Sequence, residues 1–274
     1  MSLFICSTCG TQYAESDQPP NACVICNDER QYLKKTGQQW TTLDRIALAH
    51  RTSIRFKEPG LLGIGIDPQF AIGQRALFLR TPHGNVMWDC VPAFDEAAIE
   101  MISAMGGLQA IAVSHPHFYA SVVEWSRALG DVPIYLHASD KQWVMRPDKR
   151  IRHWEGDTFR LFDGVTLIRC GGHFEGGSVL HWTGGAGGKG ILLSGDIIQV
   201  VADRKHVSFM YSYPNSIPLP THAIQRIVNA VAPYHYDRIY GGFWDMVIEG
   251  DAKNVVKRSA DRYIRAITDQ REVG

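Results

Sequence analysis

The 274-residue sequence predicts an α/β (α+β) protein of mixed sheets and helices, preceded by a small cysteine-rich module. Two observations support this prediction. Strand-like segments come first and then alternate with helical ones, the order expected when helices flank sheets. Four of the six cysteines fall within residues 6–26, a stretch too short to bury a hydrophobic core of its own. We therefore expect a module at residues 1–36 and a main domain at 40–274.

The composition excludes several classes of protein. The chain is 45% hydrophobic and 20% charged, which is ordinary for a globular protein. Lys+Arg and Asp+Glu are equal at 28 each, so no overall positive field favours nucleic acid as a partner. No apolar run approaches the roughly 18 residues of a membrane span, and the N-terminus lacks a secretory signal. These features predict a cytoplasmic protein with no membrane partner.

The module carries two Cys-x-x-Cys motifs, Cys6-Ser-Thr-Cys9 and Cys23-Val-Ile-Cys26. Each motif brings two thiolates to one ion, and two such motifs close a tetrahedral four-sulfur site. The metal would supply much of the free energy that folds so short a segment. Residues 34–39 are polar and are interpreted as a linker.

The identity of this metal stays open between zinc and iron, because tetrahedral four-sulfur sites suit both. The spacing resembles short zinc ribbons and the rubredoxin-like tails of rubrerythrins. We expect zinc with a structural role, since nothing else in the chain resembles an electron-transfer partner. Two disulfides or a redox-active Cys-x-x-Cys motif are the alternatives, and an exposed module could also bind a protein partner.

The main domain is predicted from its apolar and alternating segments, its turn residues and its helical periodicity. A helix over 94–105 ends at Gly106-Gly107, where two glycines stop the helical pattern. The remaining helices are expected at 121–129, 139–144, 221–231 and 252–267. Strands are expected at 52–56, 60–66, 74–80, 86–90, 108–113, 132–137, 158–162, 165–170, 179–182 and 191–194, and one more begins at 237.

Metal-ligating side chains recur where these strands end. His115 and His117 follow the strand at 108–113, His173 follows the strand at 165–170 between paired glycines, and Asp196 follows the strand at 191–194. Neutral imidazoles are the nitrogen ligands that Zn²⁺ prefers. Each histidine taken alone could equally be a half-buried loop residue.

The order and spacing of these residues resemble the metallo-β-lactamase superfamily over residues 50–245. His115-Pro116-His117 matches the first half of the HxHxDH motif of that superfamily. The segment Gly172-His173 to Ser178 matches its GH-x-x-GS turn, and Gly195-Asp196 matches its bridging carboxylate. Asp89 falls where the superfamily has a carboxylate below the metals. The resemblance implies an αββα sandwich with the site along one edge of the two sheets.

Three positions depart from the motif. Tyr119 and Ala120 stand where the superfamily has Asp and His, and Gly242 or Phe243 stands where its last histidine would be. Alanine has no donor atom and a neutral tyrosine is a poor ligand, so a two-metal clamp is not expected. A mononuclear site of His115, His117 and His173 remains, with Asp196 as a possible fourth ligand.

These residues predict a metal-dependent hydrolase that activates water against a small-molecule ester, thioester, lactone or amide. Asp196 would take over as the partner of the water, or Glu175 or Tyr119 would compensate. Tyr119 could instead bind an oxyanion or only pack. A second hypothesis is a non-catalytic binding protein, because ligands of the superfamily are missing. A third is an iron-dependent redox protein, with iron in either site.

Overall fold

The structure is a computed structural model that describes residues 1–268, so the predicted domain end at 274 lies outside the described residues. The chain divides into two compact units, the first from Met1 to Trp154 and the second from Glu155 onward. The cysteine-rich segment thus belongs to the first unit. No helix within residues 1–268 is long and apolar enough to cross a membrane.

The N-terminal segment has little regular structure and a small core of its own. Strand β1 (Ile5–Cys6) pairs antiparallel with β2 (Trp40–Thr41), and the helices α1 (Val24–Asn27) and α2 (Leu43–Ala49) complete the segment. The four cysteines are buried together with two apolar side chains, Tyr13 and Ile25. Because so few apolar residues take part, the cysteines make up most of this core.

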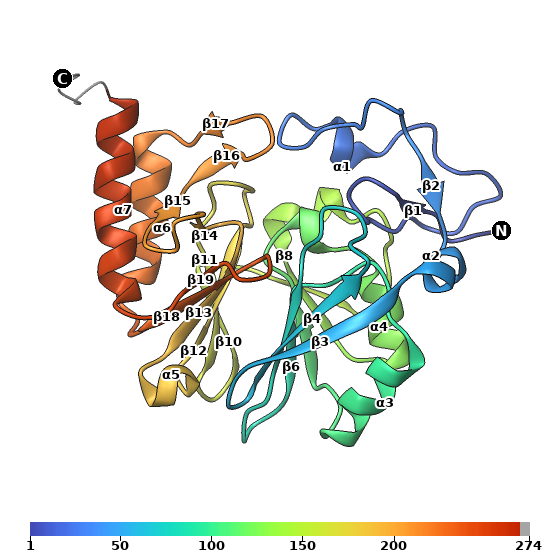
Figure 1. Cartoon of the computed structure of the whole chain (residues 1–274), viewed down its shortest axis with the longest axis horizontal. Coiled ribbons are helices and arrows are strands. Elements are labelled where there is room, and N and C mark those ends of the chain that lie inside the picture. Colours follow the sequence, from blue (N-terminus) through green and yellow to red (C-terminus); the bar gives the residue numbers. More distant parts are fainter. Residues whose placement is uncertain (269–274) are drawn as a thin grey trace. The chain divides into compact units, whose positions relative to one another are not determined.

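The first unit contains a seven-stranded sheet in the order β3-β4-β5-β6-β7-β8-β9 (Figure 1). Strands β3 to β6 are antiparallel, whereas β6 to β9 are parallel. In a parallel sheet the carboxyl ends of the strands meet at one edge, where ligands commonly bind. The strands are β3 (Arg51–Glu58), β4 (Leu61–Asp67), β5 (Ala76–Leu79), β6 (Val86–Trp88), β7 (Ala110–Ala112), β8 (Ile134–His137) and β9 (Ile151–Trp154).

Two α-helices and two 3₁₀ turns connect the parallel strands: α3 (Glu96–Ala104), η1 (Pro116–Phe118), α4 (Val122–Ala128) and η2 (Ala138–Trp143). Helix α3 starts where Asp95 accepts a hydrogen bond from the Ala98 amide at 3.0 Å, a normal N-terminal cap. It ends before Gly106, whose φ is +103°. The predicted helix at 94–105 is therefore confirmed, and the predicted helix at 139–144 is a 3₁₀ helix.

The second unit contains a six-stranded sheet in the order β10-β11-β12-β13-β18-β19. Only the β13–β18 pair is parallel. The strands are β10 (Thr158–Phe162), β11 (Val165–Arg169), β12 (Ser178–Trp182), β13 (Ile191–Gly195), β18 (Arg238–Gly241) and β19 (Val247–Ile248). Short ribbons pair β14 (Gln199–Val200) with β15 (Val207–Ser208), and β16 (Met210–Ser212) with β17 (Ile217–Pro218).

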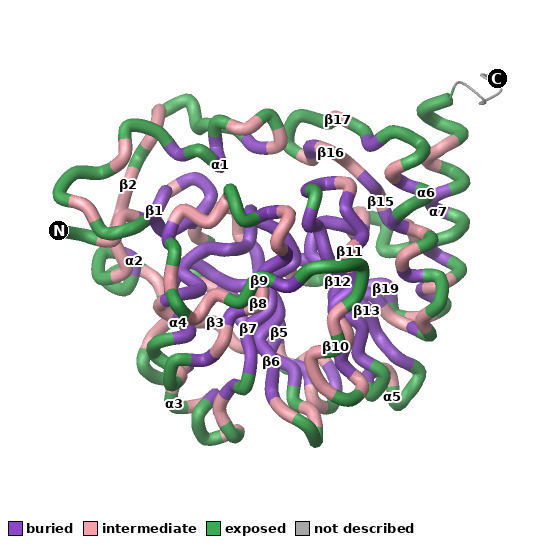
Figure 2. The backbone as a smooth tube through the Cα atoms, turned by 180° about the vertical axis from the view of Figure 1, so that it is seen from behind, coloured by how far each residue is buried: buried purple, intermediate pink, exposed green. Residues whose placement is uncertain are grey.

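Helices α6 (Thr221–Val231) and α7 (Ala252–Ile267) lie side by side in the second unit (Figure 1). Their apolar faces share one buried core with the sheet; Ile224, Val255 and Ile239 are examples. The one-turn helix α5 (Gly185–Gly188) lies in the β12–β13 connection. Buried apolar strands also form the interior of the first unit. Figure 2 shows three of them, β5, β6 and β7, in purple.

Strand β9 is an element that the sequence analysis missed. Its sequence Ile-Arg-His-Trp has two exposed polar residues between a half-buried and a buried apolar one. The strand lies at an edge of its sheet, where only part of its surface is buried. Four residues with this weak pattern do not stand out from a loop.

Gly190 is packed so closely that it has no room for a side chain, and substituting it tests the packing of the second unit. Its φ is +80°, and an added Cβ would lie 2.1 Å from the His235 carbonyl oxygen. Gly187 has a similar φ of +65° with nothing within 4 Å of the added atom. We expect Gly190→Ala to lower the free energy of unfolding by at least ~3 kcal/mol. Gly187→Ala should cost only about 1 kcal/mol; equal losses in urea denaturation would contradict this packing.

Candidate metal centres

The four cysteines converge in the first unit. Cys6 and Cys9 lie in a turn that ends at Gly10, whose amide donates to the Cys6 carbonyl at 2.8 Å. Cys23 precedes α1 and Cys26 lies within it. All four side chains are at most 3% exposed, and their sulfur atoms lie within 4.8 Å of one another.

This geometry fits a tetrahedral metal site. The Sγ atoms of Cys6 and Cys26 are 3.6 Å apart, as are those of Cys9 and Cys23. Zn–S bonds of roughly 2.3 Å would place tetrahedral ligands about 3.8 Å apart. All four thiols are free and form no disulfide, so the structure does not show the disulfide alternative.

The protonation of the thiols also indicates that a cation belongs among them. Hydrogen bonding from Cys23 lowers the pKa of Cys6, whereas the same neighbour raises the pKa of Cys9. Buried thiols this close cannot all ionise, because each negative charge opposes the next. A bound metal ion would remove that conflict and deprotonate all four.

Side chains around the cysteines direct polar atoms at the sulfurs. The Tyr13 hydroxyl donates to Cys23 Sγ at 3.4 Å, and Gln38 Nε2 donates to Cys6 Sγ at 3.3 Å. The Gln38 side-chain oxygen also accepts from the Cys23 amide at 3.1 Å. Such contacts orient metal ligands. The sequence analysis missed Tyr13, and it assigned Gln38 to a linker although this residue contacts the site.

His115 and His117 form a pair after β7. Both are buried, and their ring centroids are 5.1 Å apart. The Ser114 hydroxyl lies 2.8 Å from His115 Nδ1, which leaves Nε2 of this ring as the ligand nitrogen. The Ser114 amide donates to Asp89 Oδ1 at 2.8 Å. Burial raises the pKa of the Asp89 carboxyl to about 7. Through its hydrogen bond with the Ser114 amide, Asp89 anchors the backbone that carries the histidine pair.

Tyr119 and Ala120, at the departures from the motif, are packed inside the first unit. Burial, followed by the charge of Asp140, raises the pKa of Tyr119 well above its usual range, so its phenol is neutral. Ala120 has a φ of +45°, and its carbonyl accepts a hydrogen bond from the Gln12 amide at 3.1 Å. Ala120 has no donor atom, and a neutral phenol such as that of Tyr119 is a poor metal ligand.

His173 lies in the second unit, in the loop between β11 and β12. Its Nδ1 lies 3.2 Å from the Met210 carbonyl oxygen, so this ring too offers Nε2 as a ligand. The preceding glycines are needed for close packing. A Cβ at Gly172 would lie 2.9 Å from Leu219, and one at Gly171 would lie 3.1 Å from the Arg226 guanidinium. Arg226, which the sequence analysis did not single out, thus abuts this loop.

Asp196 follows β13 in the same unit and is 6% exposed. The Tyr213 hydroxyl donates to its carbonyl at 3.0 Å and holds its backbone. Gly242 or Phe243 stands where the superfamily resemblance would place the last histidine, and the Gly242 amide donates to the neighbouring Gly195 carbonyl at 3.2 Å. Gly242 therefore contributes a backbone hydrogen bond next to Asp196.

Glu175 lies on the surface of the second unit. Its side chain is 70% exposed and accepts from Arg169 Nη2 at 3.1 Å. This exposed ion pair gives a catalytic role of Glu175 no support, and that role stays a prediction.

The four-cysteine site can be tested by metal content. At saturating zinc, we expect Cys9→Ser to lower bound metal by one ion per chain, because a serine hydroxyl is a much weaker ligand than a thiolate. Cys90→Ala is the matched control, since Cys90 is buried in the same unit outside the group. Equal metal content in both variants, measured by mass spectrometry of the elements, would rule out the site.

Comparisons with known proteins found one protein that is similar in sequence and many solved structures that are similar in fold. No family model matches the sequence. The chain is 47% identical over 272 residues to the uncharacterised protein YmaE of Bacillus subtilis (strain 168), covering 98% of each chain. Among solved structures it is similar to the metallo-β-lactamase DIM-1, with a TM-score of 0.60 at 14% identity, over 79% of this chain and 98% of DIM-1.

Two further structures give the same result. VMB-1 is 17% identical with a TM-score of 0.58, over 79% of this chain and 98% of VMB-1. The mono-zinc form of the metallo-β-lactamase FIM-1 from Pseudomonas aeruginosa is 14% identical with a TM-score of 0.56, over 77% of this chain and 96% of FIM-1. At such low identity these similarities establish the fold.

Proposed function

We propose that this chain, which belongs to the family of YmaE and has the metallo-β-lactamase fold, is a metal-dependent hydrolase with a single catalytic zinc ion. Its substrate would be a small-molecule ester, thioester, lactone or amide. The ligands would be His115 and His117 of the first unit and His173 of the second, with Asp196 as fourth ligand or as base. The four cysteines would hold a second, structural zinc ion.

The observation that carries the proposal is the donor set. His115, His117, His173 and Asp196 are all buried, and each of them follows a strand of its own unit. Three imidazoles with a carboxylate suit zinc. Nδ1 of His115 contacts the Ser114 hydroxyl and Nδ1 of His173 contacts the Met210 carbonyl, and contacts of this kind orient metal-ligating rings.

A mononuclear site agrees with the residues that depart from the motif. Ala120 has no donor atom, the Tyr119 phenol is neutral, and Gly242 contributes backbone alone. Of the similar structures, FIM-1 is one that was solved in a mono-zinc form. We propose that this chain binds a single catalytic ion because its sequence lacks the ligands for a second one.

When bound, the zinc ion would lower the pKa of a water molecule and polarise a substrate carbonyl. The protein residues would do the rest. Asp89 and Ser114 orient the loop and the ring of His115, and the Asp196 carboxylate would accept a proton from the attacking water. Burial excludes bulk water from these groups, which strengthens their electrostatic effect.

The same departures favour a second candidate, a binding protein that retains the fold and the metal without catalysis. A closed coordination shell with Asp196 as a firm ligand would leave no position for water. Turnover decides between the two candidates.

Metal content and hydrolysis test the first candidate together. We expect wild-type protein to hold two zinc ions per chain and His173→Ala to hold one. Hydrolysis of a panel of nitrophenyl esters and thioesters should fall by ~100-fold or more in this variant. His83→Ala, at an exposed turn histidine, is the control. One ion per chain in the wild type, unchanged by His173→Ala, would contradict the proposal.

The two carboxylates should differ sharply. Asp196→Asn should lower kcat by ~10²–10⁴-fold, the range for loss of a general base. Glu175→Gln should change kcat by less than about twofold, because its exposed pair with Arg169 contributes little. Comparable losses in steady-state assays of both variants would restore the catalytic role of Glu175.

A further inference from the structure

We infer that the four-cysteine module positions the loop that carries His115 and His117, so that metal in the module strengthens metal binding by the histidines. The inference depends on one part of the proposed function, the metal site at the histidines, and does not depend on hydrolysis. All the contacts that carry it lie within the first unit. They connect residues 2–40 to two loops at the carboxyl ends of neighbouring parallel strands, β7 and β8.

The first connection is through the backbone. The Gln12 amide donates to the Ala120 carbonyl at 3.1 Å. Ala120 has a φ of +45°, a left-handed conformation that alanine does not adopt without support from its surroundings. Gln12 itself pairs with Ile5 across the turn that carries Cys6 and Cys9. The cysteine turn therefore determines where this amide lies.

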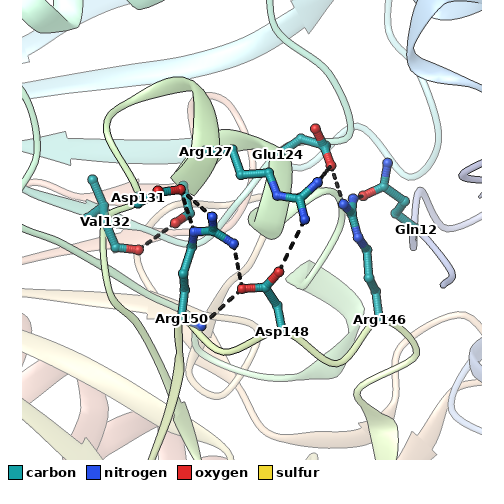
Figure 3. A network of polar contacts seen from close by, with 9 residues as sticks. Gln12, Glu124, Arg127, Asp131, Val132, Arg146, Asp148 and Arg150 are labelled. Atoms are coloured by element: carbon teal, nitrogen blue, oxygen red, sulfur yellow. Dashed lines mark hydrogen bonds and ion pairs between the residues drawn. The ribbon is translucent and has the colours of Figure 1, made fainter. Parts of the chain in front are cut away.

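The second connection is a polar network, shown in Figure 3, that is buried at Gln12 and Arg146 and reaches the surface at Arg127. The Gln12 side-chain oxygen accepts a hydrogen bond from Arg146, which is 9% exposed and also pairs with Glu124 of α4. Glu124 and Asp148 in turn pair with Arg127 at 3.5 Å each. Removing a partner is costly at the buried end of the network, where Gln12 contacts Arg146. The network thus ties the helix that follows the histidine loop to the module.

The third connection is between the module and the loop after β8. Trp143 and Met145 pack against the buried cysteine cluster. The Met145 carbonyl accepts from the Ala14 amide at 3.1 Å, and the Arg30 guanidinium lies 5.0 Å from the centre of the Trp143 ring. Since β8 is the parallel neighbour of β7, the module contacts both loops at this edge.

Metal is needed to keep the module in this position. The core of the segment consists mainly of the four thiols and, in the described part of the chain, contains only two other buried side chains, too little apolar surface to hold the segment folded. Loss of the ion would unfold the segment, as in small metal-dependent domains. Each of the three connections would then be lost. Because coupling free energies are reciprocal, the two metal sites would raise each other's affinity by the same factor.

Hydrogen exchange of the full chain tests this inference without any assay of activity. In Cys9→Ser we expect amides in residues 116–124 to exchange about tenfold faster, as for loss of a hydrogen bond and its supporting contacts. Strand β5 (Ala76–Leu79) of the same unit should be unchanged, which excludes general destabilisation. The control is Cys170→Ala, at a buried free thiol of the second unit. Unchanged exchange at 116–124 in Cys9→Ser would overturn the inference.

A second variant leaves the thiolates intact. Gln12→Ala removes the side-chain partner of Arg146, and we expect it to weaken zinc binding at the histidines severalfold in competition with a chromophoric chelator. Glu15→Ala, at an exposed neighbour, is the control. Wild-type affinity in Gln12→Ala would overturn the inference. Faster exchange in Cys9→Ser with no hydrolysis of any substrate would support the inference and reject the proposed enzyme.

Discussion

The position of the histidine pair depends on contacts between the residues that follow the parallel strands β6 and β7. Asp89 follows the first strand and accepts the amide of Ser114 after the second. Ser114 then contacts Nδ1 of His115, so one buried carboxylate sets both the backbone of the loop and the orientation of the ring. A parallel sheet brings these residues together although they are distant in the sequence. In the second unit the His173 loop joins two antiparallel strands, and the Met210 carbonyl contacts Nδ1 of its ring.

The module adds a constraint that the fold alone does not supply. In the superfamily that the sequence resembles, the positions of Tyr119 and Ala120 carry metal ligands, which fix the loop through a second ion. Here protein contacts from the module, above all the Gln12 amide, hold the same segment. These contacts fix the conformation of Ala120 and connect the helix that follows it to the cysteine segment.

Much of this architecture could be predicted from sequence, because its signals are local. The Cys-x-x-Cys spacing, the histidines after apolar strands and the glycines around His173 each lie within a few residues. Residues whose roles depend on distant partners could not be found. Gln38 resembles a linker residue until it is placed beside Cys6, and Gln12 has no role until Ala120 and Arg146 lie next to it. Edge strand β9 was missed because exposure weakens its pattern.

The central claim is that one chain holds two different zinc sites, one of cysteines and one of histidines with Asp196. The most direct measurement is anomalous X-ray diffraction above and below the zinc edge on crystals of the native protein. The account predicts two anomalous peaks per chain, one among the sulfurs of Cys6, Cys9, Cys23 and Cys26, and one at His115, His117 and His173. A single peak at the cysteines, with none at the histidines of crystals grown in zinc, would contradict it.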